Sequence, residues 1–171
     1  PRYQNEFSTH KDFSSYVDVL PMVSDRWYVT CNDGKIRSTR VDKEAFVPEK
    51  LFVDRHFCQV LGLYLAEGYI DGTVLGFGFH KKEQVLVDIV SSYFERFSFH
   101  PTITVNGNGV SVRINSFVFA EVFEKLCGKG ASNKHFIHTG DFTAEEIKTI
   151  IRYYFEGDGH LNKNGKSYMI G

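Results

Sequence analysis

The sequence predicts an α+β fold in which helices alternate with short strands. Hydrophobic residues make up 42% of the 171 residues and charged residues 24%, a composition typical of a globular domain. Apolar residues recur at helical spacing in four segments, and one further segment alternates strictly between apolar and polar side chains. The chain length predicts one domain, or one domain and a fragment.

Residues 1–50 carry the weakest pattern in the chain. Trp27–Cys31 is typical of a strand, and Asn32–Gly34 is a turn signal before Lys35–Val41, so a small hairpin is predicted. Pro48 closes this segment, and a helix is expected to begin soon after it.

Four segments have the apolar spacing of helices: Val53–Glu67, Lys82–Phe97, Ser116–Cys127 and Thr143–Gly157. The third begins at Ser116, a favoured N-cap residue, and the fourth begins with a capping box formed by Thr143 and Glu146. In the first helix, Gly62 and Ala66 lie four residues apart. Small residues at this spacing let a second backbone approach closely.

A β-hairpin is predicted from Thr102–Asn106 and Val110–Asn115, and an earlier strand from Thr73–Phe79. One face of the hairpin is expected to pack against the core: Ile103, Val105, Val110, Val112 and Ile114. The other face carries hydrogen-bonding groups throughout: Thr102, Thr104, Asn106, Ser111, Arg113 and Asn115. Because many antiparallel sheets turn such a face to water, an ordinary solvent-facing surface is the alternative interpretation.

Charge and cysteine content limit the classes of protein to which the chain can belong. The net charge of -1 argues against a uniformly basic nucleic-acid-binding protein, but a basic run over residues 26–43 includes Arg37 and Arg40. That run is either a solvated surface or a set of phosphate contacts. Three cysteines far apart in sequence argue against a disulfide framework and against a zinc site. Without an apolar segment of membrane-spanning length or a signal pattern, we expect an intracellular location and no membrane partner.

Two of the predicted helices end in the same way. Val60–Gly68 and Ile151–Gly159 each lead from a mostly apolar run through a small residue to a carboxylate, Glu67 or Asp158, and then to glycine. The helix dipole disfavours negative charge at a C-terminus, so a compensating charge is needed. A divalent cation shared by both carboxylates would supply it. The alternative is a pair of unrelated surface carboxylates.

These two segments resemble the repeated motif of the LAGLIDADG homing endonucleases, and Gly62 matches the glycine at the third motif position. The loop Asn133–Ile137, before the second copy, is similar to the basic block of the subfamily found in inteins and in free-standing enzymes. The resemblance covers residues 52–171.

The resemblance implies a fold. Each domain of the family is an αββαββα unit, which would occupy residues 51–142 here, and residues 143–171 would form the first motif helix and start of a second, incomplete repeat. The two motif helices would pack side by side, with these residues at their interface: Gly62, Ala66, Tyr153 and Gly157. Residues 1–50 would be a linker, a remnant of a splicing domain or a DNA-contacting module.

The implied activity is metal-dependent hydrolysis of phosphodiester bonds in double-stranded DNA. Glu67 and Asp158 would be catalytic residues that bind Mg²⁺ or another divalent cation. Lys134 would be a third catalytic residue that stabilises charge or orders water; the alternative is a solvated loop cation. The polar hairpin face would read bases in the major groove. Outside the resemblance, Arg37 and Arg40 of the basic run are predicted as further DNA contacts, to phosphate.

Two features depart from the family pattern. Tyr153 stands where the second motif usually has glycine, which argues against close helix packing at that point. The second repeat also stops shortly after its motif. Either the chain is a fragment, or a partner completes it. Alone, it is expected to be inactive and to self-associate through the incomplete repeat.

Two other classes of function remain as alternatives. One is a non-catalytic DNA-binding or RNA-binding protein on the same scaffold, such as a transcription regulator or a splicing maturase. The other is a structural or interaction module. The presence of both carboxylates and of Lys134 favours the nuclease.

Overall fold

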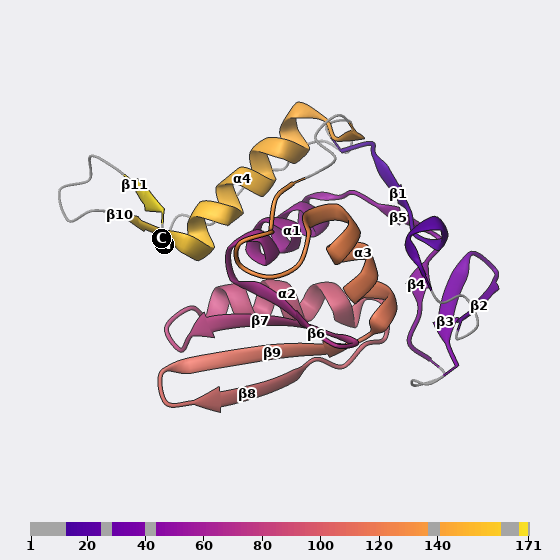
Figure 1. Ribbon diagram of the computed structural model, residues 1–171, viewed down its shortest axis with the longest axis horizontal. Coiled ribbons are helices and arrows are strands. Elements are labelled where there is room, and N and C mark those ends of the chain that lie inside the picture. The colour runs from indigo at the N-terminus through magenta and orange to yellow at the C-terminus, as the bar shows by residue number, and fades with distance from the viewer. Residues whose placement is uncertain (1–12, 25–28, 40–43, 137–140, 162–167, 171) are drawn as a thin grey trace.

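The computed structural model describes residues 13–24, 29–39, 44–136, 141–161 and 168–170, and beyond residue 158 it describes the backbone alone. The fold is α+β, as the sequence predicts (Figure 1). Its elements in chain order are β1 (Tyr16–Asp18), the short 3-10 helix η2 (Leu20–Met22), β2 (Val29–Asn32), β3 (Lys35–Ser38), β4 (Val47–Pro48), β5 (Lys50–Phe52), α1 (Arg55–Glu67), β6 (Gly68–Asp71), β7 (Val74–His80), α2 (Gln84–Glu95), β8 (Thr102–Asn106), β9 (Gly109–Asn115), α3 (Phe117–Cys127), α4 (Ala144–Asp158), β10 (Gly159–Leu161) and β11 (Tyr168–Ile170).

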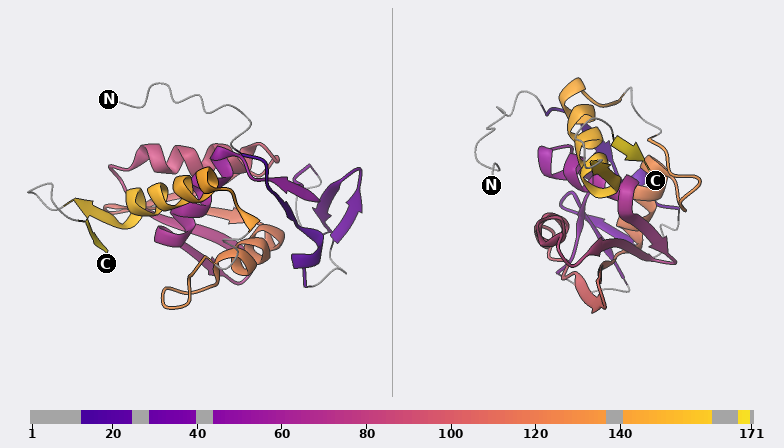
Figure 2. Two further views of the ribbon diagram at one scale, coloured as in Figure 1. Left: turned by 90° about the horizontal axis from the view of Figure 1, so that it is seen from above. Right: turned by 90° about the vertical axis from the view of Figure 1, so that its left-hand side faces the viewer.

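A four-stranded antiparallel sheet forms the centre of the molecule, in the order β6-β7-β9-β8. The helices α1, α2 and α3 pack against one face of this sheet (Figures 1 and 2). Fully buried aromatic side chains fill the space between the two layers: Phe57, Tyr64, Phe77, Tyr93, Phe94, Phe119 and Phe123. Burial of these large apolar surfaces is the main contribution to the stability of the layer.

The predicted starts of the third and fourth helices are confirmed, and α2 begins two residues later than predicted. Ser116 accepts a hydrogen bond from the Phe119 backbone N–H at 3.2 Å. Thr143 and Glu146 form the capping box, in which the Thr143 N–H donates to the Glu146 carboxylate at 2.7 Å. The first helix begins two residues later than predicted, because Asp54 is its N-cap and accepts from the Phe57 N–H at 2.7 Å.

The expectation that the apolar hairpin face packs entirely against the core is wrong for two residues. Val110, Val112 and Ile114 on β9 are buried, but Ile103 and Val105 on β8 are 49% and 65% exposed. The register explains the difference, since β9 pairs with both β7 and β8 whereas β8 is the outer strand of the sheet. Strict alternation predicts which way a side chain points, but not whether a helix covers it.

The N-terminal segment packs onto the rest of the chain. The predicted hairpin is present as β2 and β3, with Asp33 and Gly34 at positive φ in the turn. The buried carboxylate of Glu146 accepts hydrogen bonds from the backbone N–H groups of Ser14 and Ser15 and from the Ser15 hydroxyl, at 2.7 to 3.2 Å. These bonds tie the start of the described chain to the start of α4.

The helix α4 lies along α1, on the side of α1 away from the sheet (Figures 1 and 2). Among the residues that the structure describes, no helix is long and apolar enough to cross a membrane.

Candidate functional site

The two acidic helix ends lie at the same end of the molecule. Glu67 is the last residue of α1 and Asp158 is the last residue of α4, and the two helices run in the same direction (Figure 1). Partial burial raises the pKa of Glu67, and the negative charges of Asp158 and then Glu83 raise it further, whereas Lys134 lowers it. The repeat therefore brings its two carboxylates close enough to repel each other.

Matched positions of the repeat face each other across the helix pair. A Cβ atom at Gly62, the third motif position, would lie 2.9 Å from the Cβ of Tyr153, the third position of the second copy. A Cβ atom at Gly157 would lie 2.7 Å from the Cβ of Ala66, and these two residues are both at the seventh position. Contacts between equivalent positions are what a twofold axis between two parallel helices produces. All four predicted interface residues therefore lie at this interface.

Close helix packing holds at Tyr153, against the expectation drawn from its size. Its side chain is 7% exposed, and its hydroxyl accepts a hydrogen bond from Gln59 Nε2 at 2.8 Å. Gly62 makes room for it, because a side chain at that position would also collide with the Ile150 carbonyl oxygen. One glycine, rather than two, is sufficient for close approach here.

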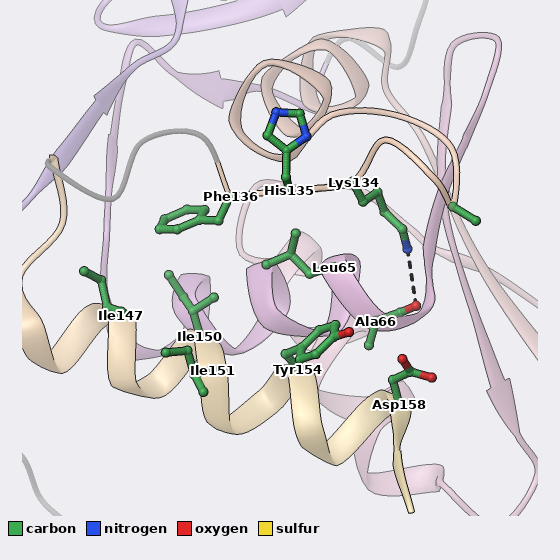
Figure 3. Close-up of a pocket in the computed structure, with 11 residues that line it drawn as sticks. Leu65, Ala66, Lys134, His135, Phe136, Ile147, Ile150, Ile151, Tyr154 and Asp158 are labelled. Carbon is green, nitrogen blue, oxygen red and sulfur yellow. Dashed lines mark hydrogen bonds between the residues drawn. The ribbon is translucent and has the colours of Figure 1, made fainter. Parts of the chain in front are cut away.

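Lys134 caps the C-terminal end of α1. Its Nζ donates to the carbonyl oxygens of Tyr64, Ala66 and Gly68 at 3.1, 3.2 and 3.1 Å, and Figure 3 shows the bond to Ala66. Partial burial lowers the pKa of Lys134, whereas the charges of Glu67 and Asp158 raise it. A cation at this place offsets the helix dipole beside Glu67, so a protein group provides the compensating charge at α1.

Asp158 borders a largely apolar pocket of about 610 Å³ between α4, the end of α1 and the loop before α4 (Figure 3). Lys134 and Tyr154 also line this pocket. Burial raises the pKa of the Tyr154 hydroxyl, and the charge of Asp158 and a hydrogen bond to it raise that pKa further. Ile151, on the same side of α4, is 50% exposed. This side of α4 therefore presents apolar surface to solvent.

Glu67 also borders an open hollow of about 840 Å³ on the polar face of the sheet. Four of the predicted DNA-reading residues line this hollow: Thr104, Asn106, Ser111 and Arg113. Thr102 and Asn115 lie on the same face, farther along their strands from the β8–β9 turn. The structure thus places the acidic helix end and most of the polar hairpin face around one space.

Several residues of this face are missing from the sequence prediction. Tyr69 lies within hydrogen-bond distance of Ser111, with 2.9 Å between their hydroxyl oxygens, and its ring lies across Gly76. His80 and Glu83 line the hollow, and the Glu83 carboxylate accepts from the His80 backbone N–H at 2.7 Å. Pairing between β6, β7 and β9 brings these residues together, and a single sequence carries no direct signal for such register.

Arg113 lies 3.3 Å from Asp71 on β6, in an ion pair whose side chains are 43% and 70% exposed. An exposed pair of this kind contributes little to stability. It does hold the guanidinium over the polar face of the sheet.

The described part of the basic N-terminal run does not lie at this face. Arg37 lies on β3, at the opposite end of the molecule from the acidic helix ends (Figure 1). Arg40 lies outside the residues that the structure describes. DNA contact by either residue stays a prediction.

The donor set at the helix ends suits a hard divalent cation, because two carboxylates supply the oxygen ligands that Mg²⁺ prefers. Within the described part of the chain, no group of three or more His, Cys, Asp or Glu side chains is placed to hold a metal ion. Glu67 and Asp158 would need further oxygen ligands, which water and a phosphate group supply at metal-dependent nuclease sites.

Comparison with known proteins does not assign the chain to a family. No family model matches the chain. It is 29% identical to the uncharacterized protein MJ1054 of Methanocaldococcus jannaschii, over 74% of this chain and 16% of the relative. It is 28% identical to the uncharacterized protein MJ0043 of the same organism, over 78% and 18%. It is 23% identical to the DNA-directed RNA polymerase subunit Rpo1C of that organism, over 90% and 18%. The chain thus spans less than a fifth of the length of each of these relatives.

Proposed function

We propose that the protein is a site-specific DNA endonuclease of the homing type, built on a LAGLIDADG scaffold and dependent on a divalent cation. The observation that carries this proposal is the paired helix ends. Matched motif positions face each other between α1 and α4, and both helices end in a carboxylate at the same place. Two unrelated surface helices have no reason to pair in this register.

The order of the elements supports the proposed scaffold. From α1 to α3 the order is α-β-β-α-β-β-α, the arrangement that the resemblance implies for one complete unit. After α4, the antiparallel pair of β10 and β11 repeats the arrangement of β6 and β7 after α1. In this proposal α4, β10 and β11 are the beginning of a second unit.

The residues of the chain have distinct tasks in the proposed reaction. Glu67 and Asp158 hold the cation, which when bound activates water and stabilises the leaving oxygen of the cleaved phosphodiester. Lys134 is a positioning residue, because its ammonium group fixes the backbone of the last turn of α1, from which Glu67 projects. Tyr154 lies one turn before Asp158 on α4 and lines the same pocket, so it borders the proposed cation site.

The polar sheet face is the proposed DNA-reading surface. Hydroxyl, amide and guanidinium groups are the side chains that hydrogen-bond to base edges in the major groove. Their place around the hollow next to Glu67 lets one duplex contact both the reading residues and the cleavage site.

The complete enzyme needs a second reading surface. The apolar side of α4 with Ile151 and Tyr154 is the place where a second unit packs, from a longer chain or from another copy. The relatives are more than five times longer than their matched segments, which is consistent with further domains in the natural protein. In this proposal the 171-residue chain alone binds DNA weakly, does not cleave it and self-associates.

A non-catalytic DNA-binding or RNA-binding protein on the same scaffold is the second candidate. The hydrogen bonding of Lys134 favours it, because all three ammonium donors are used by backbone carbonyl oxygens and none is free for a reacting phosphate. The first candidate uses Lys134 only for positioning, so a cleavage assay separates the two.

The proposal is tested with the longer protein that contains this chain, incubated with Mg²⁺ and a duplex DNA library. We expect cleavage at a defined sequence. Glu67→Gln should keep the affinity for that sequence and abolish its cleavage, whereas Glu95→Gln, at an exposed carboxylate at the end of α2, should cleave normally. Sequence-specific binding without cleavage by the unsubstituted protein would favour the second candidate, and full activity of Glu67→Gln would rule out the assigned site.

A further inference from the structure

Two glycines interrupt the polar face of β7. Gly76 and Gly78 are two residues apart, so they lie on the same side of the strand. Glycine weakens a strand, because it gains no side-chain packing and loses the most chain entropy. A glycine within a strand therefore calls for a local reason, such as the close approach of another group.

The protein itself explains Gly76 but not Gly78. A Cβ atom at Gly76 would collide with the ring of Tyr69 and lie 2.7 Å from its hydroxyl oxygen. A Cβ atom at Gly78 would have no heavy atom within 4 Å, so the space above it is open. Its backbone needs no glycine either, since Gly78 is not among the residues with positive φ.

The open space above Gly78 is part of the hollow beside Glu67. Gly78 pairs with Ser111 on β9, and Ser111 in turn pairs with Thr104 on β8, so these three residues cross the sheet in one row. Gly78, Ser111, Thr104 and Glu67 all line the hollow of about 840 Å³. The missing side chain lets a ligand reach the hydroxyl groups of this row.

The charges around the hollow indicate what kind of group enters it. Glu67 and Glu83 contribute carboxylates, and the guanidinium of Arg113 is already paired with Asp71. Apart from the cation proposed at Glu67, a phosphate group would find no unpaired Lys or Arg among the described lining residues. An uncharged base edge suits the hydroxyls of Thr104 and Ser111 and the amide of Asn106, which both donate and accept hydrogen bonds.

We propose that Gly78 is a specificity-determining position, whose missing side chain admits the major-groove edge of the base pair next to the phosphate cleaved at Glu67. This inference rests on the proposed function, because it takes duplex DNA as the ligand. It adds that one row of the sheet reads this base pair through hydroxyl groups, and that the depth of the hollow is essential for the reading.

The test begins by selecting the preferred duplex from a randomised library with the unsubstituted longer protein. Binding of the selected duplex and of an unrelated duplex is then measured for Gly78→Val and Gly78→Ala. Valine favours strand geometry, and its Cβ meets no neighbour, so the substituted protein should fold with unchanged or higher thermal stability. Val105→Ile is the matched control, because it adds bulk to an exposed strand position of the same sheet on the face opposite the hollow.

We expect Gly78→Val to lose about tenfold or more of its affinity for the selected duplex. Its affinity for the unrelated duplex should not change, and Val105→Ile should bind both duplexes normally. Gly78→Ala should show a smaller loss in the same direction, and it carries the test if the valine variant does not fold.

Three results would overturn the inference. Normal binding of the selected duplex by Gly78→Val would overturn it and leave the proposed function intact. An equal loss on both duplexes would mean that the hollow holds the DNA backbone rather than a base edge. If the unsubstituted protein binds no duplex at all, the proposed function fails and this inference fails with it.

Discussion

Lys134 and Glu67 both lie at the C-terminal end of α1, and their opposite charges affect this helix end in opposite ways. The ammonium of Lys134 neutralises the helix end through three carbonyl oxygens, while Glu67 carries a negative charge that its surroundings disfavour. An ionised carboxylate held beside another carboxylate costs folding stability. Such a cost is common where a protein keeps a group ready for function.

Because the ionised Glu67 carboxylate lowers folding stability, we expect Glu67→Gln to raise the stability in a pH-dependent way. Because the folded protein raises the pKa of Glu67, the folded state binds more protons than the unfolded state between the ordinary and the raised value. Stability in this window therefore falls as pH rises, and ionised Glu67 destabilises the protein above it. Glu67→Gln should be more stable than the unsubstituted protein at neutral pH, and the difference should vanish as pH falls below the ordinary pKa. Denaturant unfolding at several pH values measures it, and a difference independent of pH would contradict it.

Removing the charge of Lys134 should have a larger effect in the other direction. Lys134→Met keeps much of the apolar stem but removes the ammonium donor from three carbonyl oxygens at the end of α1, of which only that of Tyr64 is known to keep a second donor, the Gly68 N–H. We expect a loss of about 1.5–3 kcal/mol in the free energy of unfolding, the range for hydrogen bonds to charged groups. Lys129→Met, at an exposed residue of the same loop, is the control in chemical denaturation. Similar losses for both variants would show that the cap contributes nothing.

For single residues, contacts between near neighbours in the chain could be predicted from the sequence, whereas contacts between residues on different strands could not. The caps at Ser116 and Thr143 depend on residues three positions apart, so their signal is contained in the sequence itself. The contact of Arg113 with Asp71 and that of Tyr69 with Ser111 each join residues 42 positions apart. They depend on sheet register, which no local pattern specifies.

Among the elements, the pairing of α1 with α4 determines where the two carboxylates meet. Gly62 permits this pairing because the backbone of α4 occupies the space in which a side chain would lie. Small residues four apart predicted a close approach, whereas the size of Tyr153 argued against it. At the third motif position Gly62 of α1 leaves room for Tyr153 of α4, and at the seventh position Gly157 of α4 leaves room for Ala66 of α1.

Gly62→Ala should therefore destabilise the protein although alanine is the better helix former. Overpacking against the Ile150 carbonyl should cost about 1–3 kcal/mol, more than the gain of about 1 kcal/mol from helix propensity. Thermal or denaturant unfolding measures this loss. Gly78→Ala is the matched control, because its added Cβ meets no neighbour and should not lower stability. A stabilised Gly62→Ala would show that the helices lie farther apart than described.

In the sheet, the alternating sequence pattern predicted the direction of the side chains but not their burial. Alternation correctly predicted the two faces of the hairpin, but Ile103 and Val105 face the helical side of the sheet without cover. An outer strand has a neighbour on one side only, and its position in the sheet order becomes visible only in three dimensions.

On the proposed scaffold, the whole molecule contains one complete unit and the start of another. The buried Glu146 carboxylate joins residues 14 and 15 to the start of α4, so the N-terminal segment helps to hold the helix that carries Asp158. Composition left the role of residues 1–50 open, because a bond between groups more than 130 positions apart has no local signature. The internal repeat, in contrast, was visible in sequence because the same nine-residue pattern occurs twice.

The central claim is that Glu67 and Asp158 form one site for a divalent cation, and an NMR titration of the Glu67 carboxyl group tests it most directly. In the unsubstituted 171-residue chain, millimolar Mg²⁺ should lower the apparent pKa of Glu67, because the cation competes with the proton. In Asp158→Asn, the pKa of Glu67 without Mg²⁺ should already be lower, since a repelling charge is gone, and Mg²⁺ should shift it much less. A Glu67 titration that responds neither to Mg²⁺ nor to the substitution of Asp158 would contradict the account.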